Sequence, residues 1–137
     1  MNTARPEPAL SVLVLEPDFL LRRTVAGVVR ELGLARMHEA ASVDLARRLL
    51  GTERVDALLV ALDDEGDALR LLIDIRADHL ACAAQVPLAV TAVRCDASLA
   101  VRLKALDIRR LLLKPYRVKD MVLTLRQLLQ AQPVTPA

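Results

Sequence analysis

Apolar residues form two alternating patterns along the chain. Short runs without a helical period are typical of strands buried on both faces, whereas longer stretches with apolar residues at 3.6-residue spacing are typical of helices. The short runs predict strands at residues 10–16, 35–39, 55–62, 86–93 and 109–113. A stretch with helical spacing follows each run, so a strand and a helix alternate five times.

Capping residues indicate where several helices begin and end. Asp18, Ser42 and Asp96 precede the first, second and fourth helices, where a side-chain oxygen can accept an N–H of the first turn. Gly33 suits the left-handed residue that closes the first helix. In chain order, the residues expected on the buried helix faces are Leu21, Val25, Val28, Leu32; Val43, Ala46, Leu49, Leu50; Leu69, Leu72, Ile73, Leu80; Leu99, Leu103, Leu106; and Val118, Val122, Leu125, Leu129.

Buried strands that are separated by helices predict a parallel sheet with helices on both faces, because parallel strands need crossover connections. We therefore expect an α/β fold with a doubly wound, five-stranded parallel sheet. Ligand sites in such sheets lie outside the carboxyl ends of the strands. The residues at or just past those ends are Glu16, Pro17, Asp18, Ala61, Asp63, Thr91, Ala92 and Lys114.

Length and composition narrow the class of protein. With 137 residues, 54% of them hydrophobic, the chain fits one domain at residues 10–131, after a flexible N-terminus at 1–9 and before a tail or linker start at 132–137. The net charge of +2 and the absence of a lysine or arginine run argue against direct nucleic-acid or membrane-surface binding. No stretch of about 18 apolar residues suits a membrane span, so we expect a cytoplasmic protein.

Three other residue types are given ordinary structural interpretations. Cys82 and Cys95 lack metal or redox spacing and are expected in the core. The four glycines form neither GxGxxG nor a phosphate-binding loop, which argues against a nucleotide-binding enzyme. Helical spacing is expected to scatter a set of arginines over different solvated faces: Arg22, Arg23, Arg30, Arg36, Arg47 and Arg48.

Four segments of the chain resemble the receiver domains of bacterial two-component response regulators. They are VLVLEPDFLLRR at 12–23, VDALLVAL at 55–62, VTA at 90–92 and LLLKPY at 111–116. The Lys-Pro-aromatic step after the fifth strand is the most specific of them, and the resemblance extends from about residue 11 to residue 129. It implies the (βα)5 flavodoxin-like receiver fold and a role in signal transduction and phosphorelay.

The resemblance also assigns roles to residues at the strand ends. Working receivers transfer a phosphoryl group to an aspartate beside a divalent ion and a fixed cation. The family pattern places the acidic pair on Glu16 and Pro17 and the phosphoacceptor on Ala61. It places the switch hydroxyl on Thr91 and the cation on Lys114.

Several of these positions depart from the family pattern. The methyl group of Ala61 cannot attack phosphorus, and Pro17 removes the second acid, which leaves Glu16 and Asp18 as weak metal candidates. Leu111 stands at the position of the family's aromatic switch residue, and Pro115 resembles its cis-proline step.

Alternative roles exist for the matching residues. Glu16 either neutralises Lys114 or helps to bind a metal, with the ion pair preferred because a half-buried ammonium needs a partner. Thr91 is expected to bond to the backbone if it binds no phosphate. Asp63, in the acidic run at 63–67, is either a displaced phosphoacceptor or part of a solvated loop whose charges favour the next helix start.

Together these residues favour a pseudo-receiver that acts by phosphorylation-independent protein recognition, without enzymatic activity or cofactor. The resemblance implies a sensor kinase or an output domain as partner, and a homodimer through the segment from Asp96 to Leu129. The alternative is a phosphorylatable receiver that uses Asp63 with Mg²⁺.

Overall fold

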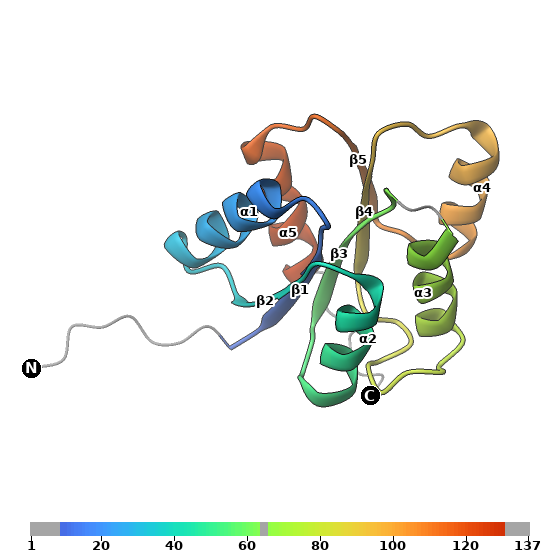
Figure 1. The fold of residues 1–137 in the computed structure, drawn as a ribbon, viewed down its shortest axis with the longest axis horizontal. Coiled ribbons are helices and arrows are strands. Elements are labelled where there is room, and N and C mark those ends of the chain that lie inside the picture. The colour runs from blue at the N-terminus through green and yellow to red at the C-terminus, as the bar shows by residue number, and fades with distance from the viewer. Residues whose placement is uncertain (1–8, 64–65, 131–137) are drawn as a thin grey trace, which may run out of the picture.

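The computed structural model describes residues 9–63 and 66–130, which form one five-stranded parallel sheet with helices on both faces (Figure 1). The strands are β1 (Ser11–Leu15), β2 (Arg36–Ala40), β3 (Ala57–Ala61), β4 (Leu88–Ala92) and β5 (Arg110–Leu113). They lie in the order β2-β1-β3-β4-β5. The chain adds β2 on one side of β1 and then β3, β4 and β5 on the other side. This change of direction confirms the doubly wound α/β prediction.

Five helices connect or follow the strands: α1 (Phe19–Glu31), α2 (Val43–Thr52), α3 (Gly66–Arg76), α4 (Ala97–Ala105) and α5 (Val118–Gln130). Helices α1 and α5 cover one face of the sheet, and α2, α3 and α4 cover the other (Figure 1). None of the helices within the described ranges is long and apolar enough to cross a membrane.

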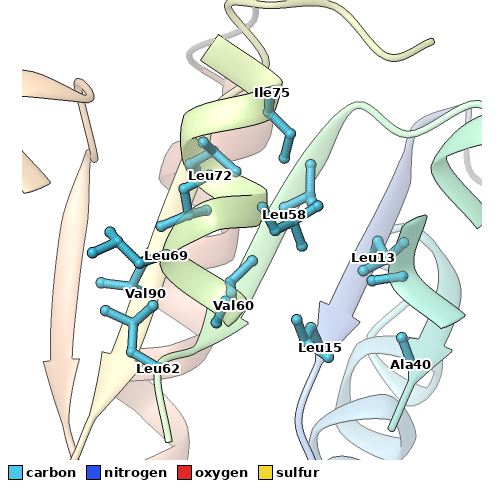
Figure 2. Close-up of a cluster of buried hydrophobic side chains, with 14 of the residues drawn as sticks. Leu13, Leu15, Ala40, Leu58, Val60, Leu62, Leu69, Leu72, Ile75 and Val90 are labelled. Atoms are coloured by element: carbon cyan, nitrogen blue, oxygen red, sulfur yellow. The ribbon is translucent and has the colours of Figure 1, made fainter. Parts of the chain in front are cut away.

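Two apolar clusters fill the space between the sheet and its helices. Leu58 and Val60 point toward α3, where they meet Leu69, Leu72 and Ile75 (Figure 2). The intervening strand residues point to the opposite cluster, beneath α1 and α5. Because both faces of the sheet are buried, the strands carry continuous apolar runs, as the sequence predicted.

Three predicted helix starts and the end of the first helix are confirmed, whereas α3 ends at Arg76, so Leu80, which was expected on the buried face of this helix, packs against the core from the segment beyond it. Asp18 accepts the N–H of Leu21 at 2.9 Å, and Asp96 caps α4 in the same way at 2.8 Å. The side chain of Ser42 accepts the N–H of the third residue of α2, and Gly33 follows α1 with a φ of 63°.

Two residues that were expected on buried helix faces are exposed instead. Leu32 is 47% exposed as the C-cap of α1, and Val118 is 46% exposed as the first residue of α5. Both stand at a helix end whose neighbouring residues are also exposed, so a correct helical period does not bury them. Both cysteines, which were expected in the core, are only partly buried, and of the two Cys82 packs against the core cluster.

Arg76 at the end of α3 links three parts of the chain. Its Nε donates to the carbonyl of Leu106 at 2.7 Å, and one terminal nitrogen donates to the carbonyls of Ala84 and Val86 at 2.8 and 2.7 Å. The other terminal nitrogen donates to the carbonyl of Asp107 at 3.2 Å. A single guanidinium thus ties the loop before β4 and the turn before β5 to α3.

Candidate functional site

The carboxyl edge of the sheet brings together residues that are distant in sequence. Leu15 pairs with Val60 in β3, so Glu16 lies one residue beyond that pair, level with Ala61. Ala61 in turn pairs with Thr91 of β4. Strand alternation places these residues on the α1 and α5 face, because their i−2 neighbours belong to that apolar cluster.

Lys114 joins this edge through two ion pairs. Its Nζ lies 2.6 Å from Oε1 of Glu16 and 2.9 Å from Oδ2 of Asp63. The Glu16 side chain is 3% exposed and that of Asp63 is 32% exposed, so the lysine connects a buried carboxylate to one at the surface. The Glu16–Lys114 pair was predicted, whereas the contact with Asp63 was not.

The two carboxylates determine the protonation of Lys114. Burial by itself lowers the pKa of this lysine, but the hydrogen bonds to Glu16 and Asp63 together outweigh burial, so the pKa lies above its ordinary value. The lysine therefore remains a cation at neutral pH, with its charge already balanced by this chain's own acids.

Glu16 uses its remaining oxygen atoms within the loop that follows β1. Its Oε2 accepts the backbone N–H of Asp18 at 3.0 Å, and its carbonyl accepts a guanidinium hydrogen of Arg22 at 2.9 Å. Asp18 directs its own Oδ1 to the N–H of Leu21, while Pro17 between the two acids is exposed. Both sequence candidates for a metal ligand are thus engaged in other contacts.

This arrangement does not fit a divalent cation. Hard cations require several free oxygen ligands, and Mg²⁺ requires near-octahedral geometry. In the part of the chain that the structure describes, no three acidic, histidine or cysteine side chains are grouped as a metal site would need. Oε1 of Glu16 and Oδ2 of Asp63 both face the lysine ammonium.

Thr91 lies beside Ala61 but is not used as expected. The residue is 2% exposed, and its Oγ1 has no hydrogen-bond partner among residues 9–63 and 66–130, so the predicted bond to backbone is wrong. Its register partner carries only a methyl group, which can neither donate nor accept a hydrogen bond. An unpaired buried hydroxyl is costly and marks the least satisfied point of the site.

The segment after Lys114 has the backbone form that the resemblance implied. The Lys114–Pro115 peptide bond is cis, and Tyr116 follows it half-buried. Burial, with smaller contributions from the negative charges of Glu16 and Asp63, raises the pKa of Tyr116 to about 12.

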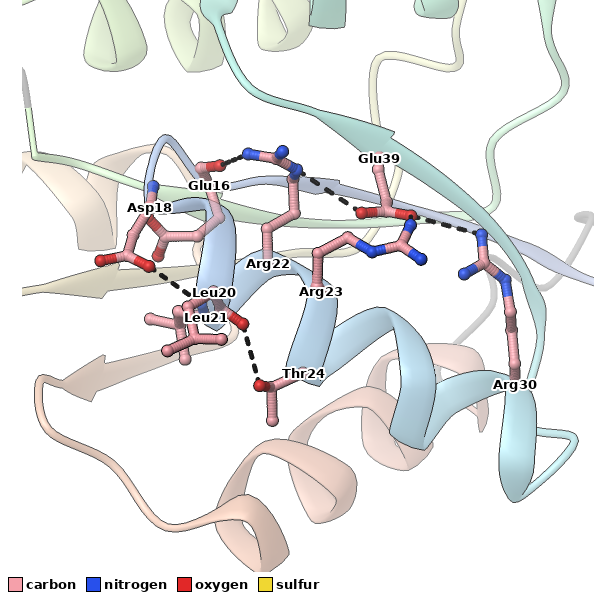
Figure 3. A network of polar contacts seen from close by, with 9 residues as sticks. All are labelled: Glu16, Asp18, Leu20, Leu21, Arg22, Arg23, Thr24, Arg30 and Glu39. Carbon is pink, nitrogen blue, oxygen red and sulfur yellow. Dashed lines mark hydrogen bonds and ion pairs between the residues drawn. The ribbon is translucent and has the colours of Figure 1, made fainter.

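Arginines of α1 converge on one acid, which corrects the interpretation of a scattered solvated surface. Arg22, Arg23 and Arg30 approach Glu39 of β2 at 3.5, 2.9 and 3.3 Å (Figure 3). Because Arg22 also binds the carbonyl of Glu16, it links this network to the Lys114 site. The helical pattern alone did not reveal it, since the acid lies on a neighbouring strand.

Comparisons with known proteins agree with the fold. No protein-family model and no curated protein sequence matches the chain. Among solved structures, the non-phosphorylated HemR receiver domain of Leptospira biflexa superposes with a TM-score of 0.80 at 18% identity, covering 93% of this chain and 99% of that one. A response regulator receiver protein of Pseudomonas putida gives 0.77 at 21% identity, with coverage of 90% and 99%. A response regulator of Thermotoga maritima gives 0.76 at 20%, with coverage of 89% and 98%.

These similarities cover almost the whole of each neighbour, so the chain has the complete receiver-type (βα)5 flavodoxin-like fold. At such low identity the shared property is the fold alone, and the role of each site residue must be argued from the site itself.

Proposed function

We propose that this chain is a receiver-type signalling domain that has lost phosphorylation and acts by protein recognition, without enzymatic activity. The observation that carries the proposal is the methyl group of Ala61 at the carboxyl end of β3, beside Glu16 and Thr91. A carboxylate at this point would be the nucleophile of a phosphoryl transfer, and a methyl group has no lone pair to offer.

Two further features support the loss of this chemistry. Lys114 is neutralised by two carboxylates of its own chain, so it is not a free cation for a phosphoryl oxygen. Both oxygens of the buried Glu16 carboxylate accept hydrogen bonds or face the lysine, which leaves a divalent ion without its ligands.

The alternative function is phosphorylation of Asp63. Its partly exposed carboxylate lies two residues beyond Ala61 and touches the Lys114 ammonium at 2.9 Å. In this reaction an Asp63 oxygen would attack the phosphorus of an acyl phosphate, and the carboxylate of the donor would leave. A lysine within contact distance is the observation that favours this second candidate.

Intact-mass spectrometry after incubation with acetyl phosphate and Mg²⁺ separates the two functions. We expect no mass increase for the wild-type chain. The positive control is a receiver domain with an aspartate at the position of Ala61, which gains one phosphoryl group under the same conditions. A gain of one phosphoryl group by the wild type that is lost in Asp63→Asn would refute the proposal and establish the alternative.

We further propose that α4, β5 and α5 form the recognition face, toward a second copy of this chain, a sensor kinase or an output domain. Exposed apolar side chains lie on all three elements, namely Val101 (69%), Leu113 (52%) and Leu123 (47%). Exposed apolar groups on adjoining elements are typical of interaction sites.

Light scattering at increasing protein concentration tests the dimer. We expect self-association in the wild type, with or without phosphodonor, and its loss in Val101→Glu/Leu123→Glu. The matched control is Leu20→Glu, which introduces a charge at an exposed residue of α1 and is expected to leave the mass unchanged. A wild-type mass that remains monomeric would contradict the dimer.

A further inference from the structure

A groove of about 540 Å³ lies between α3 and α4, separate from the Lys114 site. One wall comes from α3 and the other from α4 and the segment before it. The lining residues are Leu62, Gly66, Leu69, Arg70, Ile73, Arg94, Asp96, Ser98, Leu99 and Arg102. Leu103 is the one buried residue of α4, and Ser98, Leu99 and Arg102 of the same helix line the groove.

The lining within residues 9–63 and 66–130 carries a surplus of positive charge. Among the lining residues that the structure describes, three are arginines and one, Asp96, is an acid, whose carboxylate accepts the N–H of Leu99 as the cap of α4. Arg70 forms an ion pair with Asp74 at 3.3 Å. Within residues 9–63 and 66–130, Arg94 and Arg102 of the lining form no ion pair, so no carboxylate of these residues competes with an anionic ligand for them.

The groove also has apolar lining residues. Leu62, Leu69, Ile73 and Leu99 contribute the hydrocarbon surface, and Leu62 and Leu69 are also part of the core. Guanidinium groups bind phosphate or carboxylate through paired N–H donors, and hydrocarbon walls favour an apolar body. The volume lies within the range of about 300–1,000 Å³ that small-molecule sites occupy.

We propose that the groove between α3 and α4 binds a small organic anion that combines an apolar or aromatic body with a phosphate or carboxylate group. Arg94 and Arg102 hold the anionic group, and the leucine and isoleucine side chains contact the body. This inference is independent of the proposed function, because Glu16, Asp63 and Lys114 do not line the groove.

The test uses 1-naphthyl phosphate, which joins an aromatic body to a phosphate dianion, and follows the amide resonances of the full chain by NMR. We expect saturable shifts at Leu69, Ile73 and Leu99, with a dissociation constant on the order of 1 mM or tighter. Inorganic phosphate and uncharged 1-naphthol, each of which supplies half of the chemistry, are expected to bind at least about tenfold more weakly. Equal binding of inorganic phosphate would overturn the proposal in favour of general charge attraction.

Variants locate the binding. Arg94→Ala/Arg102→Ala is expected to weaken the binding of 1-naphthyl phosphate by at least about tenfold. The control Arg48→Ala/Arg126→Ala removes the same charge from exposed positions on α2 and α5, and we expect it to leave the affinity unchanged. Ser98→Trp fills the groove without altering charge and is also expected to block binding. Far-UV circular dichroism verifies that each variant is folded. Absence of saturable binding to the wild type, or undiminished binding to the folded arginine variant, would refute the proposal.

Discussion

Replacing Lys114 with methionine measures how strongly the charge cluster at the carboxyl edge stabilises the fold. The substitution keeps most of the side-chain volume but leaves the Glu16 carboxylate, which is 3% exposed, without the ammonium at 2.6 Å. Removing one partner of a buried ion pair costs about 3–5 kcal/mol. Glu16 retains the N–H of Asp18, so we expect a loss near the lower limit, about 3 kcal/mol.

The same contacts rank two further substitutions. Glu16→Gln keeps the shape of the side chain and leaves Lys114 paired with Asp63, so about 1–2 kcal/mol should be lost. Asp63→Asn removes the more exposed carboxylate and should cost about 0–1 kcal/mol, as surface pairs do. The Glu16→Gln/Lys114→Met double variant should lose less than the sum of its single changes, because no buried charge remains unpaired.

Urea unfolding at pH 7, followed by far-UV circular dichroism, supplies these free energies. The raised pKa of Lys114 also fixes the pH dependence: its stabilisation is complete below its ordinary pKa of 10.5 and is lost as the pH rises through the higher folded-state value. The difference between the wild type and Lys114→Met should therefore shrink above that pH. A Lys114→Met protein as stable as the wild type at pH 7, or an Asp63→Asn loss as large as that of Lys114→Met, would refute this reasoning.

Other residues give independent tests. Lysine has no planar guanidinium to donate to carbonyls of separate loops, so Arg76→Lys should lower the free energy of unfolding in urea by about 2 kcal/mol. The control Arg126→Lys, on the surface of α5, should leave this free energy unchanged. Tyr116 is the single tyrosine of the chain, so ultraviolet absorbance should show half-ionisation near its raised pKa of about 12, and at a slightly lower pH in Glu16→Gln, because burial, the main cause of the shift, remains. The hydrogen bond from Arg47 lowers the pKa of Asp74, so its stabilisation is present above the ordinary value of 3.8 and is lost as the pH falls below it. Asp74→Asn should accordingly lose less stability than the wild type on acidification; an equal loss would contradict this.

Hydrophobic periodicity predicted the order and type of every helix and strand, because buried strands and half-buried helices impose different spacings on apolar residues. Asp18, Ser42 and Asp96 marked helix starts correctly, since a cap is a local interaction within a few residues. The errors at Leu32 and Val118 have a nonlocal cause. Periodicity gives the direction of a side chain, but not whether anything lies opposite it at the end of a helix.

The candidate site was predictable to the extent that sheet topology determines it. Strand ends converge in a parallel sheet, so the pairing of Glu16 with Lys114 followed from their positions. The position of Asp63, on the same alternating side as Ala61, was a usable signal for its contact with the lysine. The arginine cluster on Glu39 was out of reach, because it depends on how α1 lies over β2.

The charge balance along the carboxyl edge distinguishes its two candidate anion sites. At Lys114, an incoming dianion would have to displace Asp63 and remain close to Glu16, so Coulomb repulsion and the broken pair both oppose binding. Thr91 would gain a hydrogen bond to the dianion, but a bond from one neutral donor contributes only about 1 kcal/mol against this cost. At the α3–α4 groove, Arg94 and Arg102 have no competing ion pair among the described residues, and Asp96 is occupied as a helix cap. We therefore expect a phosphate-bearing ligand to shift the resonances of the groove at concentrations that leave the Lys114 site unchanged, and the reverse order would contradict the assignment of both sites.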